Sequence, residues 1–421
     1  MNSIYKNMSK TEIEIIEGGT DKKKLMIMGA GIYQVPLIKK AKAMGLETLV
    51  VSIPGEYPGI ALADEFIPLD TRDKEGILKY AMERGIRGIC TSGTDVAVQT
   101  IGYVNEHMNL SGISYEAAQK VTDKLLMKQA FSKHDVSTAA FEKVTSYEQA
   151  LSAADTIGYP VIVKIVDSSG SRGVKKVKSR EELLDAYTEA SNITKKDYLL
   201  IEAFIDAEEI GVDAFVGEHG IEVFLPHEKF TYTVNGVTVP MGHAFPFHAD
   251  NKLFAELEKQ MNLAVEAVGL KNCPVNADVF IKEDKVWIIE IGGRTGATCI
   301  PELISTYKGY DWYEKIIRAA LGESVDFTSE KEIPCMAKLL FSHKDGIIKH
   351  IDQKVVQTLL EKGVIVQLDY GIGKTIETMK NATDRIGHVI MSGDDESVLD
   401  EYLAMLRGAI ELEENSSKLE M

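Results

Sequence analysis

Two acidic side chains stand in neighbouring apolar segments that the sequence predicts to pair as a hairpin. Asp278 lies within 275–281 and Glu290 within 286–291, and the polar residues 283–285 form the predicted turn. Paired strands could place both carboxylates on one face, where hard oxygen ligands suit Mg²⁺ that carries a triphosphate. Each acid considered alone could instead form a structural salt bridge.

A guanidinium group follows the second acid at short range. Arg294 lies four residues after Glu290, in the segment 292–296 (GGRTG). Positive charge at this position suits a phosphoryl group in transfer, and the glycines allow a ligand to approach closely. The alternative is an ion pair between Arg294 and Glu290.

A lysine and a run of small residues form a second candidate site. Lys164 lies in the apolar strand predicted at 161–166, and four residues later the chain continues with Ser168, Ser169, Gly170, Ser171, Arg172 and Gly173. Backbone N–H groups beside an ammonium group suit a phosphate chain. The run is not a Walker A motif, because no Gly-Lys-Ser/Thr follows the glycines. A hairpin tip with solvated basic residues is the alternative.

Two glutamates follow the next predicted strand. The apolar segment 199–201 leads into Glu202, and Glu209 comes seven residues later. An extended segment can offer backbone C=O and N–H groups to an adenine edge, while a later carboxylate reaches ribose hydroxyls. Taken separately, such glutamates are usually surface charges.

The order of these motifs resembles the ATP-grasp superfamily, and the resemblance covers residues 24–412. The matching positions, in chain order, are Lys124, Lys164, the run 168–173, Glu202, Glu209, Asp278, Glu290 and Arg294. Within the superfamily the chain is most similar to carboxylate–amine ligases of the L-amino acid ligase type, on the segments 240–246 and 292–298.

The resemblance implies an ATP site. Lys124 would contact the α-phosphate and Lys164 the α- and β-phosphates, and the run 168–173 would close over the β- and γ-phosphates. Glu202 would face the adenine amino group, and Glu209 would hold the ribose. The Ala203 carbonyl and the Ile205 amide would complete the contacts to the adenine edge.

The resemblance also implies a metal and transfer site. Asp278 and Glu290 would bind Mg²⁺, for which Mn²⁺ can substitute, and Arg294 and Lys164 would be the catalytic cations. The family commonly has Asn-Pro between the second acid and the arginine, whereas this chain has Gly292-Gly293. One expected metal ligand is therefore missing.

The implied reaction joins a carboxylate to an amine. ATP would phosphorylate a small-molecule carboxylate to an acyl phosphate, and an amine would then displace phosphate to give an amide or peptide bond. The substrates, which could be amino acids, are not named by the sequence; the substrate-site candidates are His227, His243, Arg294 and Gly296. For each histidine a packed or solvated role is an equal alternative.

Other functions remain open at this point. A carboxylase of the same superfamily would phosphorylate bicarbonate. A nucleotide sensor would keep the ATP site without turnover, which the Gly292-Gly293 departure motivates. A dinucleotide-binding dehydrogenase is disfavoured, because Gly29-x-Gly31 lacks the third glycine and the next predicted strand lacks an acid at its end.

The surrounding pattern predicts an α/β protein with an ATP-grasp fold and several domains. The N-terminal domain is expected to be a doubly wound βαβ (pre-ATP-grasp) domain, followed by α+β ATP-binding domains and a C-terminal α+β domain. The expected divisions are an extension at 1–21, the βαβ domain at 22–115, a small lid domain at 116–200, a large domain with the metal site at 201–330, and the C-terminal domain and tail at 331–421.

Composition restricts the partners. Lys and Arg number 47 against 64 Asp and Glu, a net charge of −17 that disfavours nucleic acid and anionic membranes. The 4 cysteines are scattered without metal-binding spacing, and neither a signal peptide nor a membrane span is evident, so a cytoplasmic protein with buried thiols is expected. Dimers are frequent among related ligases, so a homodimer is possible.

Overall fold

The computed structural model describes residues 22–166, 173–234, 237–379 and 384–413. The predicted extension at 1–21 and the predicted phosphate-loop residues Ser168, Ser169, Gly170 and Ser171 lie outside the described residues. Gly173, the last residue of that run, is described.

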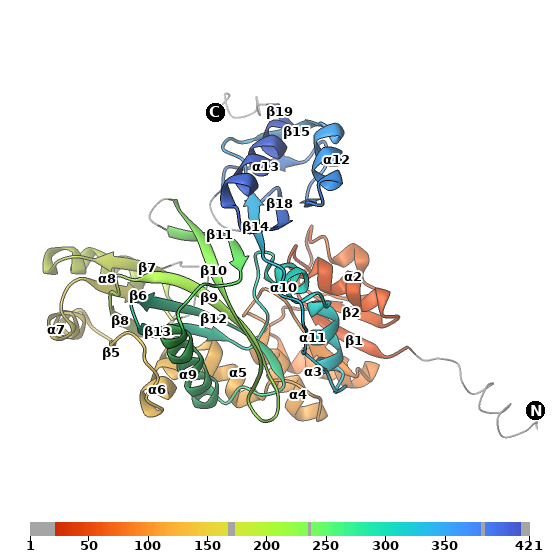
Figure 1. Ribbon diagram of the computed structural model, residues 1–421. Coiled ribbons are helices and arrows are strands. Elements are labelled where there is room, and N and C mark those ends of the chain that lie inside the picture. The colour runs from red at the N-terminus through yellow and green to blue at the C-terminus, as the bar shows by residue number, and fades with distance from the viewer. Residues whose placement is uncertain (1–21, 167–172, 235–236, 380–383, 414–421) are drawn as a thin grey trace, which may run out of the picture.

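The N-terminal unit is built on a parallel sheet (Figure 1). Its strands, in the order β3-β2-β1-β4, are β1 (Lys24–Met28), β2 (Glu47–Val51), β3 (Glu65–Ile67) and β4 (Gly88–Cys90). Its helices are α2 (Val35–Ala43), α3 (Lys74–Arg84) and α4 (Val98–Met108), and a short 3₁₀ turn covers Ile60–Leu62. The apolar runs of β1 and β2 are almost entirely buried, as expected when helices cover a parallel sheet. The predicted parallel βαβ sheet is confirmed.

Two short helices lead from this unit into the rest of the chain. They are α5 (Tyr115–Thr122) and α6 (Lys124–Lys133). Asp123 separates them, and its carboxylate accepts hydrogen bonds from the N–H groups of Leu125 and Leu126. This N-cap fixes the start of α6 and therefore the position of Lys124 in its first turn.

A four-stranded sheet with two helices forms the next unit. Its strands, in the order β5-β8-β6-β7, are β5 (Phe141–Val144), β6 (Val161–Lys164), β7 (Val174–Val177) and β8 (Leu199–Ala203). The helices are α7 (Tyr147–Ile157) and α8 (Arg180–Ile193), whose small and apolar residues pack against buried side chains of β6 and β8. The expected domain boundary at residue 200 falls inside β8.

The largest sheet has eight strands and crosses the centre of the molecule (Figure 1). Five of its strands are β9 (Glu208–Val216), β10 (Ile221–Val234), β11 (Val237–Phe245), β12 (Cys273–Lys282) and β13 (Lys285–Gly292). Burial alternates strictly along β12, with Val275, Ala277 and Val279 in the core. Helix α9 (Asn251–Val268) packs against β13, so Asn276 and Asp278 lie on the face away from the core.

The C-terminal unit continues this sheet. Strands β14 (Cys335–Leu340), β18 (Gly387–Ser392) and β16 (Ile365–Leu368) extend it beyond β11. A smaller sheet of β15 (Gly346–Ile351), β17 (Thr375–Ile376) and β19 (Ile410–Glu413), with α12 (Gln353–Glu361) and α13 (Glu396–Gly408), completes the unit. Helix α13 ends at Gly408, and Ile410 then pairs with Ile351 of β15.

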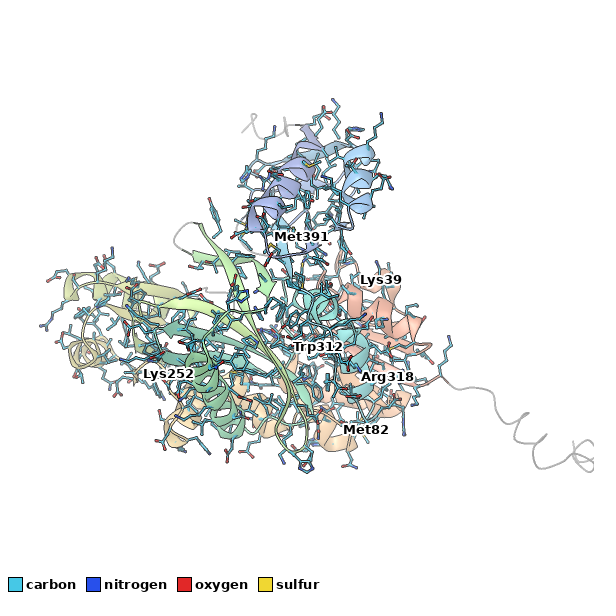
Figure 2. The ribbon with its side chains drawn as sticks, in the orientation of Figure 1. Lys39, Met82, Lys252, Trp312, Arg318 and Met391 are labelled. Carbon is cyan, nitrogen blue, oxygen red and sulfur yellow. The ribbon has the colours of Figure 1, made fainter. Side chains whose placement is uncertain are left out.

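Helices α10 (Ile300–Lys308) and α11 (Trp312–Ala320) join the units. Trp312 lies near the centre of the molecule (Figure 2), is fully buried, and donates a hydrogen bond from Nε1 to Thr295 Oγ1 at 2.9 Å. On the other side of α11, Tyr313 and Ile317 pack into the core of the parallel sheet. The N-terminal unit and the segment that carries Arg294 are therefore held by one helix.

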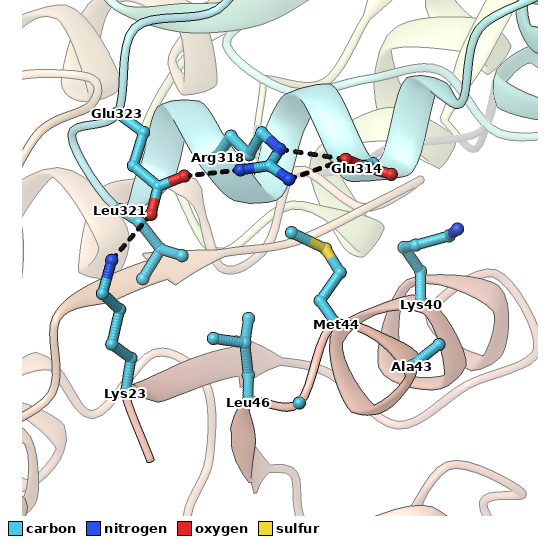
Figure 3. Close-up of a pocket in the computed structure, with 10 residues that line it drawn as sticks. Lys23, Lys40, Ala43, Met44, Leu46, Glu314, Arg318, Leu321 and Glu323 are labelled. Carbon is cyan, nitrogen blue, oxygen red and sulfur yellow. Dashed lines mark hydrogen bonds and ion pairs between the residues drawn. The ribbon is translucent and has the colours of Figure 1, made fainter. Parts of the chain in front are cut away.

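A surface hollow lies between α2 and α11 (Figure 3). Its charged groups pair with each other: Lys23 with Glu323 at 2.7 Å, and Arg318 with Glu314 and Glu323 at 2.9 Å each. None of its lining residues is a predicted site residue. The Lys23–Glu323 pair ties the N-terminal unit to the residues that follow α11, whereas both pairs of Arg318 lie within α11 and its C-terminal end. Among the described residues, no helix combines the length and apolar composition needed to cross a bilayer.

Candidate active site

The two predicted metal acids face each other across a strand pair. Asp278 of β12 and Glu290 of β13 are direct register partners in an antiparallel pair, so their side chains leave the same face of the sheet. Asp278 Oδ1 lies 2.8 Å from Lys229 Nζ, and Glu290 Oε1 lies 3.4 Å from Lys124 Nζ. Each carboxylate therefore has a lysine as its neighbour.

Lys229 is a site residue that the sequence reasoning missed. Its ammonium group lies between Asp278 and Glu209, with Nζ 2.5 Å from Glu209 Oε1. Burial by itself would lower the pKa of Lys229, but the two carboxylates outweigh it and raise that pKa, so the lysine stays charged. Leu225, His227 and Lys229 occupy every second position along the buried side of β10. A lysine on the buried side of a strand is unusual, and this position was the sequence signal for a site residue.

The pKa values of Glu209 and Asp278, the two acids beside Lys229, are shifted in opposite directions. Burial raises the pKa of Glu209, and the nearby Asp278 adds to this against the opposing effect of Lys229. For Asp278, burial would also raise the pKa, but Lys229 outweighs it and the pKa is lowered. Of the two acids, Asp278 is therefore the one whose ionised form the protein favours.

A second charged cluster is almost completely buried. Glu202 Oε2 lies 3.6 Å from Lys164 Nζ and 3.6 Å from Lys128 Nζ. Burial would raise the pKa of Glu202, but Lys164 and Lys128 together outweigh it and lower that pKa. The other carboxylate oxygen, Oε1, is buried and has no hydrogen-bond partner among the described residues. An unpartnered buried acceptor is costly, so this oxygen is suited to a donor group on a ligand.

Lys128 was also missed from the sequence. It lies one helical turn after Lys124 on α6, so the two share a face, and this spacing was the available signal. Its Nζ donates a hydrogen bond to Thr138 Oγ1 at 2.8 Å. Burial lowers the pKa of Lys128 to about 8, although Glu202 opposes the shift.

Arg294 lies at the end of β13 and is held by a residue of the N-terminal unit. Its Nε and Nη2 donate to the two carboxylate oxygens of Asp95, at 2.8 Å each, and its Nη1 donates to Asn276 Oδ1 at 2.8 Å. Burial would lower the pKa of Arg294, but Asp95 outweighs it. The ion pair with Glu290 that the sequence allowed is wrong, because the structure pairs Glu290 with Lys124.

Two of the substrate-site candidates contact Asp213, a fully buried acid of β9, and a third packs against one of them. Asp213 accepts hydrogen bonds from the Gly296 N–H at 2.9 Å and from Asn276 Nδ2 at 2.8 Å, and His227 Nε2 lies 3.3 Å from it. The His243 ring packs edge-on against His227, and burial lowers the pKa of His243 well below its usual value. Both histidines are enclosed, and His227 is linked through Asp213 to the loop that carries Gly296.

The remaining predicted nucleotide residues follow from the small sheet. Ala203 ends β8, and its N–H donates to the Ala140 carbonyl at 2.8 Å. Ile205 comes two residues later, beyond the strand. Gly173 precedes β7, and its carbonyl accepts from the Ile165 N–H at 3.0 Å, so it closes the base of the predicted phosphate loop.

The donor set suits a hard cation. Asp278 and Glu290 offer carboxylate oxygens from one face, and Mg²⁺ typically binds to one or two carboxylates together with phosphate and water. Within the described ranges, no three His, Cys, Asp or Glu side chains gather closely enough to hold a metal by themselves. All four cysteines are buried and free. The acids therefore fit Mg²⁺ that arrives with a nucleotide.

Comparison with known proteins identifies the class. Residues 157–302 match the family model of the ATP-grasp domain. Phosphoribosylglycinamide synthetase from Anaerococcus prevotii is similar over 94% of this chain and 100% of its own, with 28% identity and a TM-score of 0.77. The protein therefore has the ATP-grasp fold, and residues 157–302 carry its ATP-grasp domain.

More distant structures agree on the fold. L-amino acid ligase from Bacillus licheniformis matches 94% of this chain and 99% of its own, with 16% identity and a TM-score of 0.75. N5-carboxyaminoimidazole synthetase from Staphylococcus aureus matches 92% of this chain and 98% of its own, with 18% identity and a TM-score of 0.71. The ATP-grasp fold predicted from the order of the motifs is confirmed.

Proposed function

We propose that the protein is an ADP-forming ligase that activates a substrate carboxylate as an acyl phosphate and joins it to an amine. The observation that carries the proposal is the face shared by Asp278 and Glu290, which has Lys124 and Lys229 beside the acids. Opposed carboxylates with surrounding cations suit a metal-bound triphosphate.

The buried cluster around Glu202 is the proposed adenine end of the nucleotide site. The unpartnered Oε1 would accept a hydrogen bond from the adenine amino group, while Lys164 and Lys128 keep the carboxylate ionised. Lys164 also ends β6 next to the predicted phosphate loop, so it could reach from the carboxylate to the phosphate chain. Glu209 remains the proposed ribose ligand.

The proposed chemistry starts from the poor reactivity of a carboxylate. Transfer of the γ-phosphoryl group of ATP converts a poor electrophile into a mixed anhydride with a good leaving group. When bound, Mg²⁺ would neutralise charge on the phosphates. Lys164 would hold the departing phosphates and Arg294 would hold the phosphate of the acyl phosphate, after which the amine displaces that phosphate.

The enclosed histidines change the expectation for the amine. His227 and His243 have no exposed surface with which to remove a proton from a substrate, so we propose that they support the segment 294–298 instead. The carboxylate and the amine, which could both be amino acids, would then bind beside this segment. The similar structure of L-amino acid ligase has the same fold, and its name is consistent with amino acids as substrates.

The decisive experiment measures ADP, AMP and phosphate release from Mg-ATP. The purified protein would be given pooled amino acids and small carboxylic acids, and in a separate reaction bicarbonate alone. ADP and phosphate that depend on the pool support the ligase, and removing components one by one identifies the pair. AMP and pyrophosphate would overturn the acyl phosphate mechanism, while ADP with bicarbonate alone would favour the carboxylase.

One observation favours a second candidate, a nucleotide sensor without turnover. Gly292 provides no side chain where the family commonly has a metal-binding asparagine, and among the described residues no three His, Cys, Asp or Glu side chains are grouped so that they could hold a metal. This candidate predicts that Mg-ATP binds but that no pool of substrates releases ADP. Calorimetric titration with Mg-ATP, run beside the turnover assay, distinguishes the two: binding without ADP release in any pool supports the sensor, and ADP release that depends on the pool supports the ligase.

A further inference from the structure

Asp95 reaches Arg294 from a different part of the chain. It lies in the loop between β4 and α4 of the N-terminal unit, 199 residues before Arg294. Both of its oxygens accept from the guanidinium at 2.8 Å, a bidentate geometry that fixes the orientation of the planar group. Both side chains are largely shielded from solvent, with exposed fractions of 29% for Asp95 and 15% for Arg294.

The carboxylate of Asp95 occupies the space that a side chain at residue 292 would need, and residue 292 is a glycine. A Cβ atom placed on Gly292 would lie 2.9 Å from Asp95 Oδ1 and 3.7 Å from Arg294 Cζ. The backbone of Gly292 is not in the left-handed region, so its conformation does not require glycine. A side chain at residue 292 would therefore press on the carboxylate that holds Arg294.

Further contacts fix the loop that carries Asp95. Ser92 forms a parallel bridge with Thr295, and the Gly93 N–H donates to the Thr295 carbonyl at 3.2 Å. On the opposite side, Asn276 holds Nη1 of Arg294. The N-terminal unit thus binds to the residue next to Arg294 as well as to its guanidinium.

We propose that Asp95 is a positioning residue for Arg294, and that the N-terminal unit supplies it in the space left free by Gly292. The inference rests on the proposed function, in which Arg294 holds the phosphate of the acyl phosphate. The carboxylate that holds Arg294 comes from another unit of the chain, so docking of the N-terminal unit sets the direction of the guanidinium.

The first test is the kinetic effect of removing the carboxylate. Asp95→Ala is expected to lower kcat for ADP formation by about 10- to 100-fold and to leave KM for ATP within about threefold, as Arg294→Ala does. The double variant should be no slower than the slower single variant, because both remove one function. A folded Asp95→Ala protein with full kcat, or losses that multiply in the double variant, would overturn the proposal.

The second test moves the carboxylate to the strand. With Asp95 replaced by alanine, a side chain at 292 has room, and its Cβ lies near the guanidinium. Asp95→Ala with Gly292→Asp is expected to recover at least about tenfold of the lost kcat, whereas Gly292→Asp alone crowds two carboxylates and lowers it. A folded rescue variant no faster than Asp95→Ala counts against the proposal.

A third measurement does not depend on turnover. Inorganic phosphate is titrated into the Mg-ADP complex by calorimetry, and its affinity should fall at least about tenfold in Asp95→Ala and in Arg294→Ala. The matched control is Lys40→Ala, which removes a different link between the N-terminal unit and α11, the 2.6 Å pair with Asp311, and should change neither kcat nor phosphate affinity. If the wild type forms no ADP but its phosphate affinity still falls in Asp95→Ala, the proposed function is refuted and the positioning role stands. If the phosphate affinity of Asp95→Ala is unchanged, the positioning role is refuted.

Discussion

Lys229 Nζ lies 2.8 Å from Asp278 Oδ1, so the acid proposed to bind the metal already has a positive partner within the protein. Glu209 shares the same ammonium group. The three groups sum to one negative charge, which limits the repulsion between two acids that both face the proposed nucleotide. Binding of a metal-nucleotide complex at Asp278 must therefore rearrange contacts that the protein makes by itself.

Replacing Lys229 by methionine should destabilise the fold by leaving two neighbouring acids without their shared cation. We expect a loss of about 1–2 kcal/mol in the free energy of unfolding, below the full cost of breaking a buried pair because both acids are partly exposed. Urea unfolding at pH 7 measures it. Lys252→Met is the control, because its pair with Asp284 is exposed to solvent and its loss should leave the free energy of unfolding almost unchanged. Equal losses in the two variants would contradict the central role of Lys229.

Much of the fold follows from local patterns. The hairpin of β12 and β13 was predictable because two apolar segments flank a short polar turn, and its register then places Asp278 opposite Glu290. The three-residue strand β3 carries too little pattern to be recognised. The last strand, β19, was missed because its apolar residues continue the helical spacing of α13, and only pairing with β15 shows that the helix has ended.

The site was less predictable than the fold, because its decisive contacts join distant residues. Lys124 and Lys164 could be matched to motifs, whereas Asp95 has no pattern that links it to Arg294 across 199 residues. The orientation of the Arg294 guanidinium depends on which carboxylate the tertiary structure places beside it. The same limit applies to His227, whose enclosure depends on how closely β9 and β10 approach each other.

Lys164→Ala and Glu290→Ala should each abolish ADP formation, with losses of at least about 100-fold, while the protein remains folded. Lys164→Ala would remove the proposed contact with the phosphates, and Glu290→Ala would remove the proposed contact with the metal. Turnover and circular dichroism together check this. Lys175→Ala is the matched control, since Lys175 lies on the neighbouring strand β7 and pairs with Glu189 at the surface. Full turnover in either site variant would show that the assignment is wrong.

Gly211→Ala should disrupt the support beneath the loop 294–298. A Cβ at residue 211 would lie 2.0 Å from His227 Cε1, and the enclosed ring has no space into which to move. We expect a loss of about 1–3 kcal/mol in stability, as for other overpacked sites. Thermal unfolding measures it, with Gly408→Ala as the control, because nothing lies within 4 Å of a Cβ there.

A double variant checks the cause of that loss. If the clash with His227 is responsible, Gly211→Ala combined with His227→Ala should be less destabilised than the sum of the two single variants. Simple addition of the two losses would show that Gly211 matters for another reason.

Lys128 should make stability depend on pH in the alkaline range. Its pKa is about 8 in the folded protein, because burial disfavours the charged form, against about 10.4 for an unfolded lysine. Between these values the unfolded chain binds the additional proton, so the free energy of unfolding should rise with pH, by up to about 1.4 kcal/mol per pH unit. Urea unfolding of the wild type and Lys128→Met from pH 7 to 10 tests this: the wild type should gain on the variant above pH 8. Lys39→Met, on an exposed site of α2, controls for the loss of a lysine, and a constant difference between wild type and Lys128→Met would contradict the buried, depressed pKa.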